Sequence, residues 1–293
     1  MVFMSEETFS LRERLAVGGQ HVLPKQGLTR LVGWAAGLQG GAMTHAVIRW
    51  FVARYGVDMS EAAEPDVRAY ATFNAFFTRA LRPEARPLAD ADWLCPVDGA
   101  ISQFGPIQGE QIFQAKGHQY STTALLGGDA QLAAGFENGH FATLYLSPRD
   151  YHRIHMPCAG RLQRMMHVPG ALYSVNPLTA RGVPGLFARN ERVVCLFDTE
   201  FGPLALVLVG ATIVGSMATA WHGVVNPPRP GQLRHFDYSQ QDVALAQGAE
   251  MGRFLLGSTV VLLWPRQALR FEPDWATGRS VRMGEAMARA EGT

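Results

Sequence analysis

The N-terminal part of the chain places apolar residues at helical spacing. From position 43 they recur at i, i+4, i+7 and i+8, the pattern of an amphipathic helix, as Met43, Val47, Trp50 and Phe51. Arg49 and Arg54 border this stripe. A second segment, Arg68 to Leu81, carries three phenylalanines and stops before Pro83, so it predicts a further helix. We therefore expect residues 1–87 to form a helical region.

After Pro87 the pattern changes to short apolar runs, many of them β-branched, separated by Gly, Pro and Asn. Such runs predict strands, and they include Phe141–Leu146, Val193–Phe197, Leu204–Val209 and Thr259–Trp264. The sequence thus predicts the α+β class, with N-terminal amphipathic helices followed by a β-rich, barrel- or sandwich-like catalytic core over residues 88–275. The tail, residues 276–293, is rich in Arg, Glu and Gly, and we expect it to fray.

Composition narrows the class of protein. With 293 residues, 47% of them hydrophobic and 17% charged, the chain can bury a sizeable core. A net charge of +1 gives no general attraction to nucleic acid. The three cysteines lack CxxC spacing, which favours buried thiols in a reducing compartment. The N-terminus lacks the profile of a secretion signal, and the most apolar stretch, Leu204–Val214, is shorter than the roughly 20 residues that span a bilayer. We therefore expect a chain that does not cross a membrane.

Two short segments bring acidic and imidazole groups into the predicted core. Asp98 stands in a Pro/Gly turn before the strand-like run Ala100–Phe104, and an isolated Asp-Gly of this kind more often caps a turn. His152 and His155 lie three residues apart, with Cys158 three further on. These histidines are open to interpretation as acid–base residues, as ordinary surface or core histidines, or as metal ligands. Because the chain offers no second paired cluster of ligands, we expect no metal.

A third segment places Ser258 directly after Gly257 at the start of a predicted strand. Taken alone, this is ordinary turn chemistry. The G-x-S-x-G sequence of a hydrolase nucleophile elbow does not occur in the chain. No single segment therefore decides the function.

Together the three segments resemble the phosphatidylserine decarboxylase family. Leu256–Thr259 (LGST) is similar to the family's processing motif, Ser147–Pro157 (SPRDYHRIHMP) to its histidine motif, and Val97–Gly99 to its aspartate motif. Further similar segments are Thr72–Asn74, Phe76–Phe77, Lys116–His118, Ser174–Pro177, Asn190–Arg192 and Val209–Gly215. The resemblance covers residues 23–264, with the motifs in order and at family-like separations.

This resemblance implies a self-processing, pyruvoyl-dependent enzyme that converts phosphatidylserine to phosphatidylethanolamine and CO₂. The Ser258 hydroxyl would attack the Gly257 carbonyl to form an ester, and elimination and hydrolysis would leave a pyruvoyl group on the new N-terminus. The products would be a β chain, residues 1–257, and an α chain, residues 258–293. These two chains would form a heterodimer, and we expect a dimer of such units.

The resemblance also assigns roles to individual residues. His155 would be the base that activates Ser258, with Asp98 fixing its tautomer, in the logic of a serine–histidine–aspartate triad. His152 is the candidate donor for the proton of decarboxylation. His118 is a candidate for substrate binding.

Pyridoxal phosphate is the other electron sink that would serve an amino-acid decarboxylation, and it needs an anchoring lysine and a phosphate site. The chain contains only Lys25 and Lys116, and Lys116 has no Gly/Ser-rich phosphate cradle beside it. We therefore expect no pyridoxal phosphate, because a carbonyl generated from Ser258 would perform the same task.

The implied substrate is a bilayer lipid, so the enzyme needs a surface that contacts the membrane. The region from Leu11 to Arg54 is the candidate for that surface. Its basic residues outnumber the single acid, Glu13, and they are Arg12, Arg14, Lys25, Arg30, Arg49 and Arg54. Basic residues beside an apolar stripe with Trp50 suit a helix that lies on anionic lipid. The alternative is that the stripe packs on the enzyme's own core. We expect peripheral association with the cytoplasmic face of the inner membrane.

Other functions remain open at this point. A serine hydrolase could use Asp98, His155 and Ser258 on an external substrate, and it would remain a single chain. A catalytically silent relative could act as a membrane-bound scaffold, although the intact triad residues argue against it. A decarboxylase could also act on a related serine phospholipid.

Overall fold

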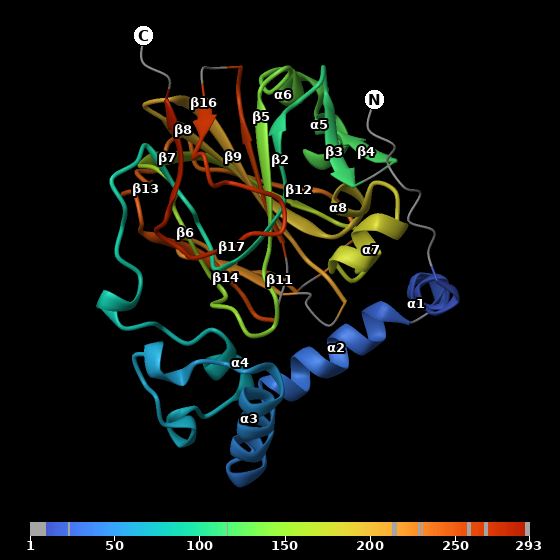
Figure 1. Ribbon diagram of the computed structural model, residues 1–293, viewed down its shortest axis with the longest axis vertical. Helices are drawn as coiled ribbons and strands as arrows, with labels where there is room; N and C mark the ends of the chain where they lie inside the picture. Colours follow the sequence, from blue (N-terminus) through green and yellow to red (C-terminus); the bar gives the residue numbers. More distant parts are fainter. Residues whose placement is uncertain are drawn as a thin grey trace.

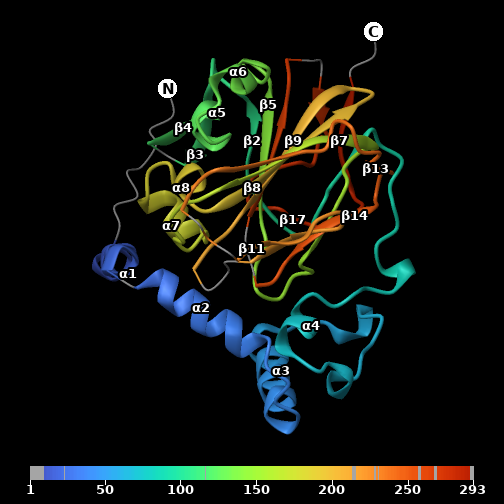
Figure 2. The same cartoon turned by 180° about the vertical axis from the view of Figure 1, so that it is seen from behind.

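The computed structural model describes residues 10–22, 24–115, 117–212, 216–227, 229, 231–256, 259–266 and 269–290. Three helices come first, α1 (Leu11–Val22), α2 (Lys25–Ala36) and α3 (Ala42–Tyr55). α1 lies beside the strand-rich part of the molecule near α7, and α2 and α3 continue below it (Figure 1; Figure 2). α3 ends at Gly56, whose positive φ of 68° is accessible to a residue without Cβ, and the Gly56 N–H donates to the Val52 carbonyl.

The largest sheet has nine strands in the described part of the chain, and its pairings are antiparallel. Its order is β12 (Arg234–Asp237), β7 (Gly160–Val168), β8 (Arg192–Thr199), β9 (Gly202–Val209), β15 (Thr259–Trp264), β5 (His140–Tyr145), β2 (Gly99–Pro106) and β17 (Ser280–Val281), with β13 (Ala244–Leu245) also paired to β7. The strands expected from the apolar runs are confirmed, and β15 has the expected bounds.

The centre of this sheet is buried on both faces. Every residue of β15 is buried, and its side chains alternate between two hydrophobic clusters. Val261 and Leu263 belong to one cluster, and Val260 and Leu262 belong to the other. This burial on both faces explains why the apolar runs are continuous rather than alternating with polar residues.

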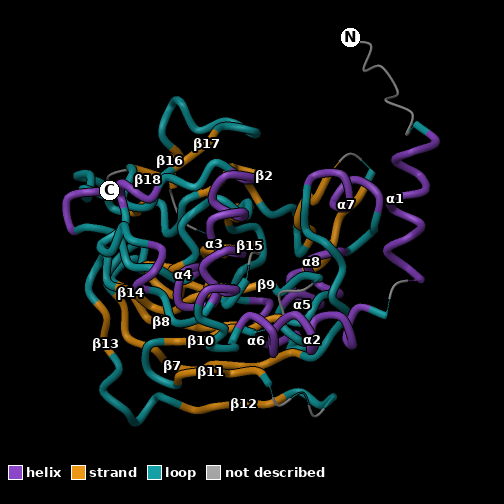
Figure 3. The backbone as a smooth tube through the Cα atoms, turned by 90° about the horizontal axis from the view of Figure 1, so that it is seen from below, coloured by secondary structure: helices purple, strands orange, loops and turns teal. Residues whose placement is uncertain are grey.

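Different layers cover the two faces. Against one face packs a four-stranded sheet in the order β11 (Gly223–Asn226), β10 (Met217–Thr219), β14 (Glu250–Phe254) and β6 (Arg153–His155). The other face is covered by α5 (Thr122–Leu125), α6 (Ala130–Ala134), α7 (Pro177–Gly182) and α8 (Leu186–Arg189), while α3 and α4 (Phe73–Phe77) lie below the sheets and join the same hydrophobic cluster (Figure 1). Figure 3 shows these layers from below, with α1 beyond α7. The α+β class and the sandwich-like core are confirmed.

Smaller elements complete the core. A three-stranded sheet has the order β1 (Trp93–Leu94), β18 (Ala286–Ala290) and β16 (Leu269–Phe271), and β3 (Gln111–Ala115) pairs with β4 (His118–Ser121). The three cysteines are buried free thiols, as expected.

The expectation that the C-terminal tail frays is wrong as far as Ala290. β17 pairs with β2, and β18 lies between β1 and β16. Met287 of β18 is fully buried. The tail therefore contributes to the core, because it places buried apolar residues such as Met287 between its charged residues.

The expected helix over Arg68–Leu81 is also wrong for most of its length. Apart from a 3₁₀ turn at Val67–Ala69, only α4 is helical there, and α4 begins after Thr72, whose hydroxyl accepts from the Ala75 N–H. Beyond α4 the backbone is extended, because residues 80–82 form hydrogen bonds with residues 61–63. Tertiary pairing thus overrides the helical pattern.

Large apolar side chains remain exposed on the first three helices. Met43, Trp50 and Trp34 are 76%, 60% and 64% exposed, whereas Phe51 packs against Phe73 and neighbouring aromatic rings. The apolar stripe of α3 is thus divided between solvent and core. Among the described residues, no helix combines the length and the apolar character needed to cross a bilayer.

Candidate active site

The aspartate and histidine segments lie side by side in the fold. The His155 N–H donates to the Pro96 carbonyl at 2.9 Å, two residues before Asp98. β6, which ends at His155, pairs with β14, and the Phe254 N–H at the end of β14 donates to the His152 carbonyl at 3.0 Å. The structure therefore brings both segments next to the strand that leads toward the processing motif.

The processing segment connects the two packed sheets. It leaves β14 in the four-stranded sheet and enters β15 at the centre of the nine-stranded sheet, where Thr259 pairs with Tyr145 and Val209. Gly257 and Ser258, the expected cleavage site, lie outside the described residues. Leu256, directly before them, has a φ of 148°, a conformation that residues with a Cβ rarely adopt. Backbone strain is therefore present one residue from the expected cleavage site.

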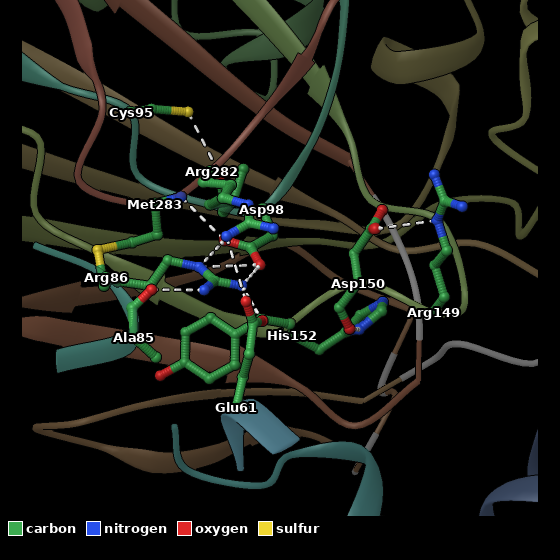
Figure 4. Close-up of polar contacts among 12 residues, drawn as sticks. Glu61, Ala85, Arg86, Cys95, Asp98, Arg149, Asp150, His152, Arg282 and Met283 are labelled. Atoms are coloured by element: carbon green, nitrogen blue, oxygen red, sulfur yellow. Dashed lines mark hydrogen bonds and ion pairs between the residues drawn. The ribbon is translucent and has the colours of Figure 1, made fainter. Parts of the chain in front are cut away.

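Asp98 is held in a buried ion pair with Arg86 (Figure 4). Arg86 donates from Nε to Asp98 Oδ1 at 2.9 Å and from Nη2 to Oδ2 at 2.5 Å, and it also donates to Glu61 at 2.7 Å. The Met283 N–H donates to Asp98 Oδ1 at 2.9 Å. Burial by itself lowers the pKa of Arg86, but the hydrogen bonds to Asp98 and Glu61 outweigh it and raise that pKa. Asp98 thus joins the N-terminal region to the C-terminal segment.

His155 has other partners than the expected one. Its Nδ1 donates to the Gly248 carbonyl at 2.7 Å, because a carbonyl oxygen only accepts. Its Nε2 therefore carries a lone pair, which accepts from the Tyr151 hydroxyl at 3.0 Å. Gly248, rather than Asp98, fixes the tautomer in this structure, and Asp98 acts on His155 through its charge. Burial lowers the pKa of His155, while Gly248 and the nearby carboxylates oppose that shift.

His152 is fully buried against Phe77, with 4.1 Å between the ring centroids. Its Nδ1 donates to the Asp150 carbonyl at 2.7 Å, and Figure 4 shows the ring beside Asp150. Its Nε2 is buried and has no hydrogen-bond partner among the residues that the structure describes. Burial lowers the pKa of His152 to about 3, so the ring is neutral near pH 7 and Nε2 is a free base.

The other candidate residues lie apart from this cluster. His118 stands on β4, in the hairpin with β3. Lys25 lies with its ammonium 4.3 Å from the ring centroid of Tyr173, and Lys116 is outside the described residues. A search of the described residues for three or more His, Cys, Asp or Glu side chains able to hold a metal found none.

Several residues of the site were not predicted. Arg86 and Glu61 belong to the N-terminal region, and the Gly248 contact is made by a backbone carbonyl, which leaves no sequence signal. Tyr151 stands inside the histidine motif, directly before His152, and among the described residues its phenol is the side chain that forms a hydrogen bond with His155. Its place next to His152 was the sequence feature that could have identified Tyr151 as part of the site.

Comparison with known proteins decides the family. A family model described as phosphatidylserine decarboxylase matches residues 73–289. The chain belongs to the phosphatidylserine decarboxylase family. A second family model, described as PSD, matches residues 15–56, within the N-terminal helices.

Curated members of the phosphatidylserine decarboxylase family are similar along almost the whole chain. A phosphatidylserine decarboxylase proenzyme from Acidovorax ebreus (strain TPSY) is 72% identical over 278 residues, covering 95% of this chain and 98% of the relative. Proteins of the same name from Azoarcus sp. (strain BH72) and Delftia acidovorans (strain DSM 14801 / SPH-1) are 70% and 69% identical. The shared length covers 94% and 95% of this chain, and 96% and 98% of those relatives.

Proposed function

We propose that this chain is the precursor of an enzyme that converts phosphatidylserine to phosphatidylethanolamine and CO₂. Membership of the phosphatidylserine decarboxylase family and relatives named proenzymes support the reaction and the self-processing. The observation that carries the proposal is the buried His152. Its backbone carbonyl accepts from the Phe254 N–H of β14, the strand that leads toward Ser258, and its ring Nε2 makes no hydrogen bond with the described residues.

The cofactor is a pyruvoyl group made from Ser258, after cleavage into a β chain (1–257) and an α chain (258–293). It supplies a ketone carbonyl, which accepts the electron pair that CO₂ leaves behind. The described surroundings fit such a group. The His152 Nε2 has no partner among the described residues, and the strained backbone at Leu256 favours rearrangement of the chain next to it.

For the reaction we assign His152 a proton relay at Nε2. The serine amine of the substrate arrives as an ammonium group and must lose a proton before it can act as a nucleophile. That proton leaves with the water of condensation. After CO₂ has left, the α-carbon needs one proton, which His152 delivers from Nε2 and replaces from solvent. Because burial holds the pKa of His152 low, the carboxylate and phosphate of the bound substrate must raise it before Nε2 can carry that proton.

For self-processing we assign His155 the role of base. Its Nε2 lone pair takes the proton of the Ser258 hydroxyl when the Tyr151 hydroxyl turns away, while the Gly248 carbonyl keeps Nδ1 protonated. Asp98 stabilises the resulting imidazolium by its charge. It also holds Arg86 and Met283 and thereby the two ends of the core.

We further propose that α1–α3 rest on the cytoplasmic face of the inner membrane. Their exposed Met43, Trp50 and Trp34 side chains lie among basic residues, as an interfacial helix on anionic lipid requires. The αβ units associate as a dimer in this proposal.

The decisive test compares the purified protein with its Ser258→Ala variant by denaturing mass spectrometry. The wild type should separate into two chains divided between Gly257 and Ser258, the smaller with an N-terminal pyruvoyl, and the variant should stay whole. A wild type that remains one folded chain would refute the proposal and favour a hydrolase acting on an external ester.

The relay is tested separately with His152→Ala. We expect this variant to cleave itself and to lose CO₂ release from phosphatidylserine. If it cleaves normally and decarboxylates at the wild-type rate, the role of His152 is wrong, whereas the pyruvoyl proposal stands.

A further inference from the structure

A cavity of about 560 Å³ lies between α2 and the segment that leads toward Ser258. We call it the α2 cavity. Its walls include Arg30 and Trp34 of α2, Asn74 of α4, Arg229, Leu255 and Leu256. Its volume is in the range of small-molecule sites. Leu256 stands two residues before Ser258 in the sequence, so the cavity adjoins the processing segment.

The ionisable groups that line the α2 cavity are basic. Among the described lining residues these groups are Arg30 and Arg229, and none is acidic. Arg229 is anchored by its Nε, which donates to the buried Glu191 at 2.8 Å, and Glu191 in turn bonds His167. Within the described part of the chain, the Nη groups of Arg229 make no hydrogen bond and Arg30 makes no ion pair. Two guanidinium groups are thus available to an anionic ligand.

Asn74 adds a polar atom that lacks its partner. Its Oδ1 is buried and makes no hydrogen bond within the described part of the chain, although most buried polar atoms have one. An amide oxygen only accepts, so the missing partner is a donor. Asn74 stands one helical turn before Phe77, whose ring packs on His152. The cavity therefore lies close to the imidazole that we assign to the proton relay.

A second cavity near the site, of about 350 Å³, has a different character. Its lining contains four acids, Asp58, Glu61, Asp98 and Asp150, together with four arginines. These acids oppose the entry of an anionic group. A phosphoserine headgroup carries a phosphate, a carboxylate and one ammonium, and so has a net negative charge. The α2 cavity fits it better.

We propose that the α2 cavity binds the phosphoserine headgroup of the lipid. Arg30 and Arg229 hold its anionic groups, and Asn74 Oδ1 accepts a hydrogen bond from its ammonium. Trp34, which is 64% exposed, lies at the rim, where the acyl chains leave toward the surface of α2. The inference rests on the proposed function and names the site that the reaction uses.

The test uses a short-chain phosphatidylserine dissolved as monomer, so that binding to a membrane surface plays no part. Arg30→Ala should raise KM about tenfold, which is the low end of the value of a hydrogen bond to a charged group, and should leave kcat within about twofold. Asn74→Leu keeps the shape without the acceptor and should raise KM several-fold. Arg229 is unsuitable, because its removal leaves Glu191 buried without its ion pair.

The control is Arg270→Ala on β16, which removes an exposed positive charge from a residue outside the α2 cavity. It should leave KM unchanged. Inhibition by glycerophosphoserine should weaken in Arg30→Ala in proportion to KM. An unchanged KM in both Arg30→Ala and Asn74→Leu, with both proteins processed, would overturn the headgroup site. A wild type that is not processed would instead refute the proposed function, so the two failures are distinguishable.

Discussion

The first three helices expose several large apolar side chains, whereas the central sheet buries them. In β15 every side chain is buried, whereas on α2 and α3 Trp34, Met43 and Trp50 remain mostly exposed beside basic residues. The sheet gains its stabilisation when the chain folds. The helices keep apolar area uncovered for a later contact, and a patch of this kind on a folded surface marks an interaction site. Apart from Thr259, the strand is apolar along its whole length, whereas the helices mix apolar residues with polar and basic ones.

The largest effect is expected in the sheet. Leu262→Ala should lower the free energy of unfolding by about 2–5 kcal/mol, because it opens a cavity between two packed layers. Urea denaturation of the Ser258→Ala precursor, which remains a single chain, measures the loss. Trp50→Ala in the same background should change the stability by about 0.5 kcal/mol or less. Comparable losses at both positions would remove the distinction between the regions.

The second effect concerns the helices alone. Trp50→Glu should weaken binding to anionic vesicles at least tenfold, because insertion of a large apolar side chain contributes about 1.5–3 kcal/mol, and stability should be unchanged. Co-sedimentation with vesicles measures this. Val224→Glu on β11 is the matched control, since Val224 is 52% exposed but lies outside the helices. Unchanged vesicle binding by Trp50→Glu would exclude α3 from the membrane contact.

The smallest effect is expected outside both regions, at the contact of Phe77 on α4 with His152 before β6. Burial lowers the pKa of His152 to about 3, from about 6.5 in an unfolded chain. Below pH 6.5 the unfolded chain binds a proton that the folded chain does not. The contribution to stability is therefore complete above pH 6.5 and is lost as the pH falls toward 3.

His152→Gln should accordingly make stability less dependent on pH between 5 and 6.5, as measured by urea denaturation of the Ser258→Ala precursor. His155, whose pKa burial also lowers, accounts for part of the remaining slope. His235→Gln, at an exposed position on β12, is the control and should leave the slope as it is. Equal slopes in the His152→Gln variant and its parent would contradict a neutral, buried His152.

The four strands β5, β8, β9 and β15 were predictable because each lies in a largely apolar run, as in Leu204–Val209, whereas β7 and β14 mix apolar with polar and charged residues and gave no such signal. The extended course after α4 was not predictable, because it depends on hydrogen bonds between residues 80–82 and 61–63, which no local pattern encodes. The same holds for β18. Its buried Met287 and Ala288 stand among charged residues, and its partners β1 and β16 come from distant parts of the core and the tail.

The motifs brought Asp98, His152 and His155 to one part of the fold, as the resemblance implied. Their partners could not be read in advance. Arg86 lies before Pro87, outside the segment that contains Asp98, and the two side chains meet only in the folded protein. The tautomer of His155 depends on the backbone carbonyl of Gly248. A shared neighbourhood was thus visible in the sequence, and individual hydrogen bonds were not.

The central position of β15 has a consequence for the life of the enzyme. In the proposed processing the chain is cut before Ser258, and this strand becomes the first strand of a separate molecule, held between β9 and β5 without a covalent link. The precursor folds with β15 tethered, at a high effective concentration. The processed enzyme that unfolds releases two molecules, so its return depends on their concentration and competes with aggregation. The lifetime of the processed enzyme is then set by its rate of unfolding. The precursor can refold reversibly, whereas the processed enzyme relies on kinetic stability.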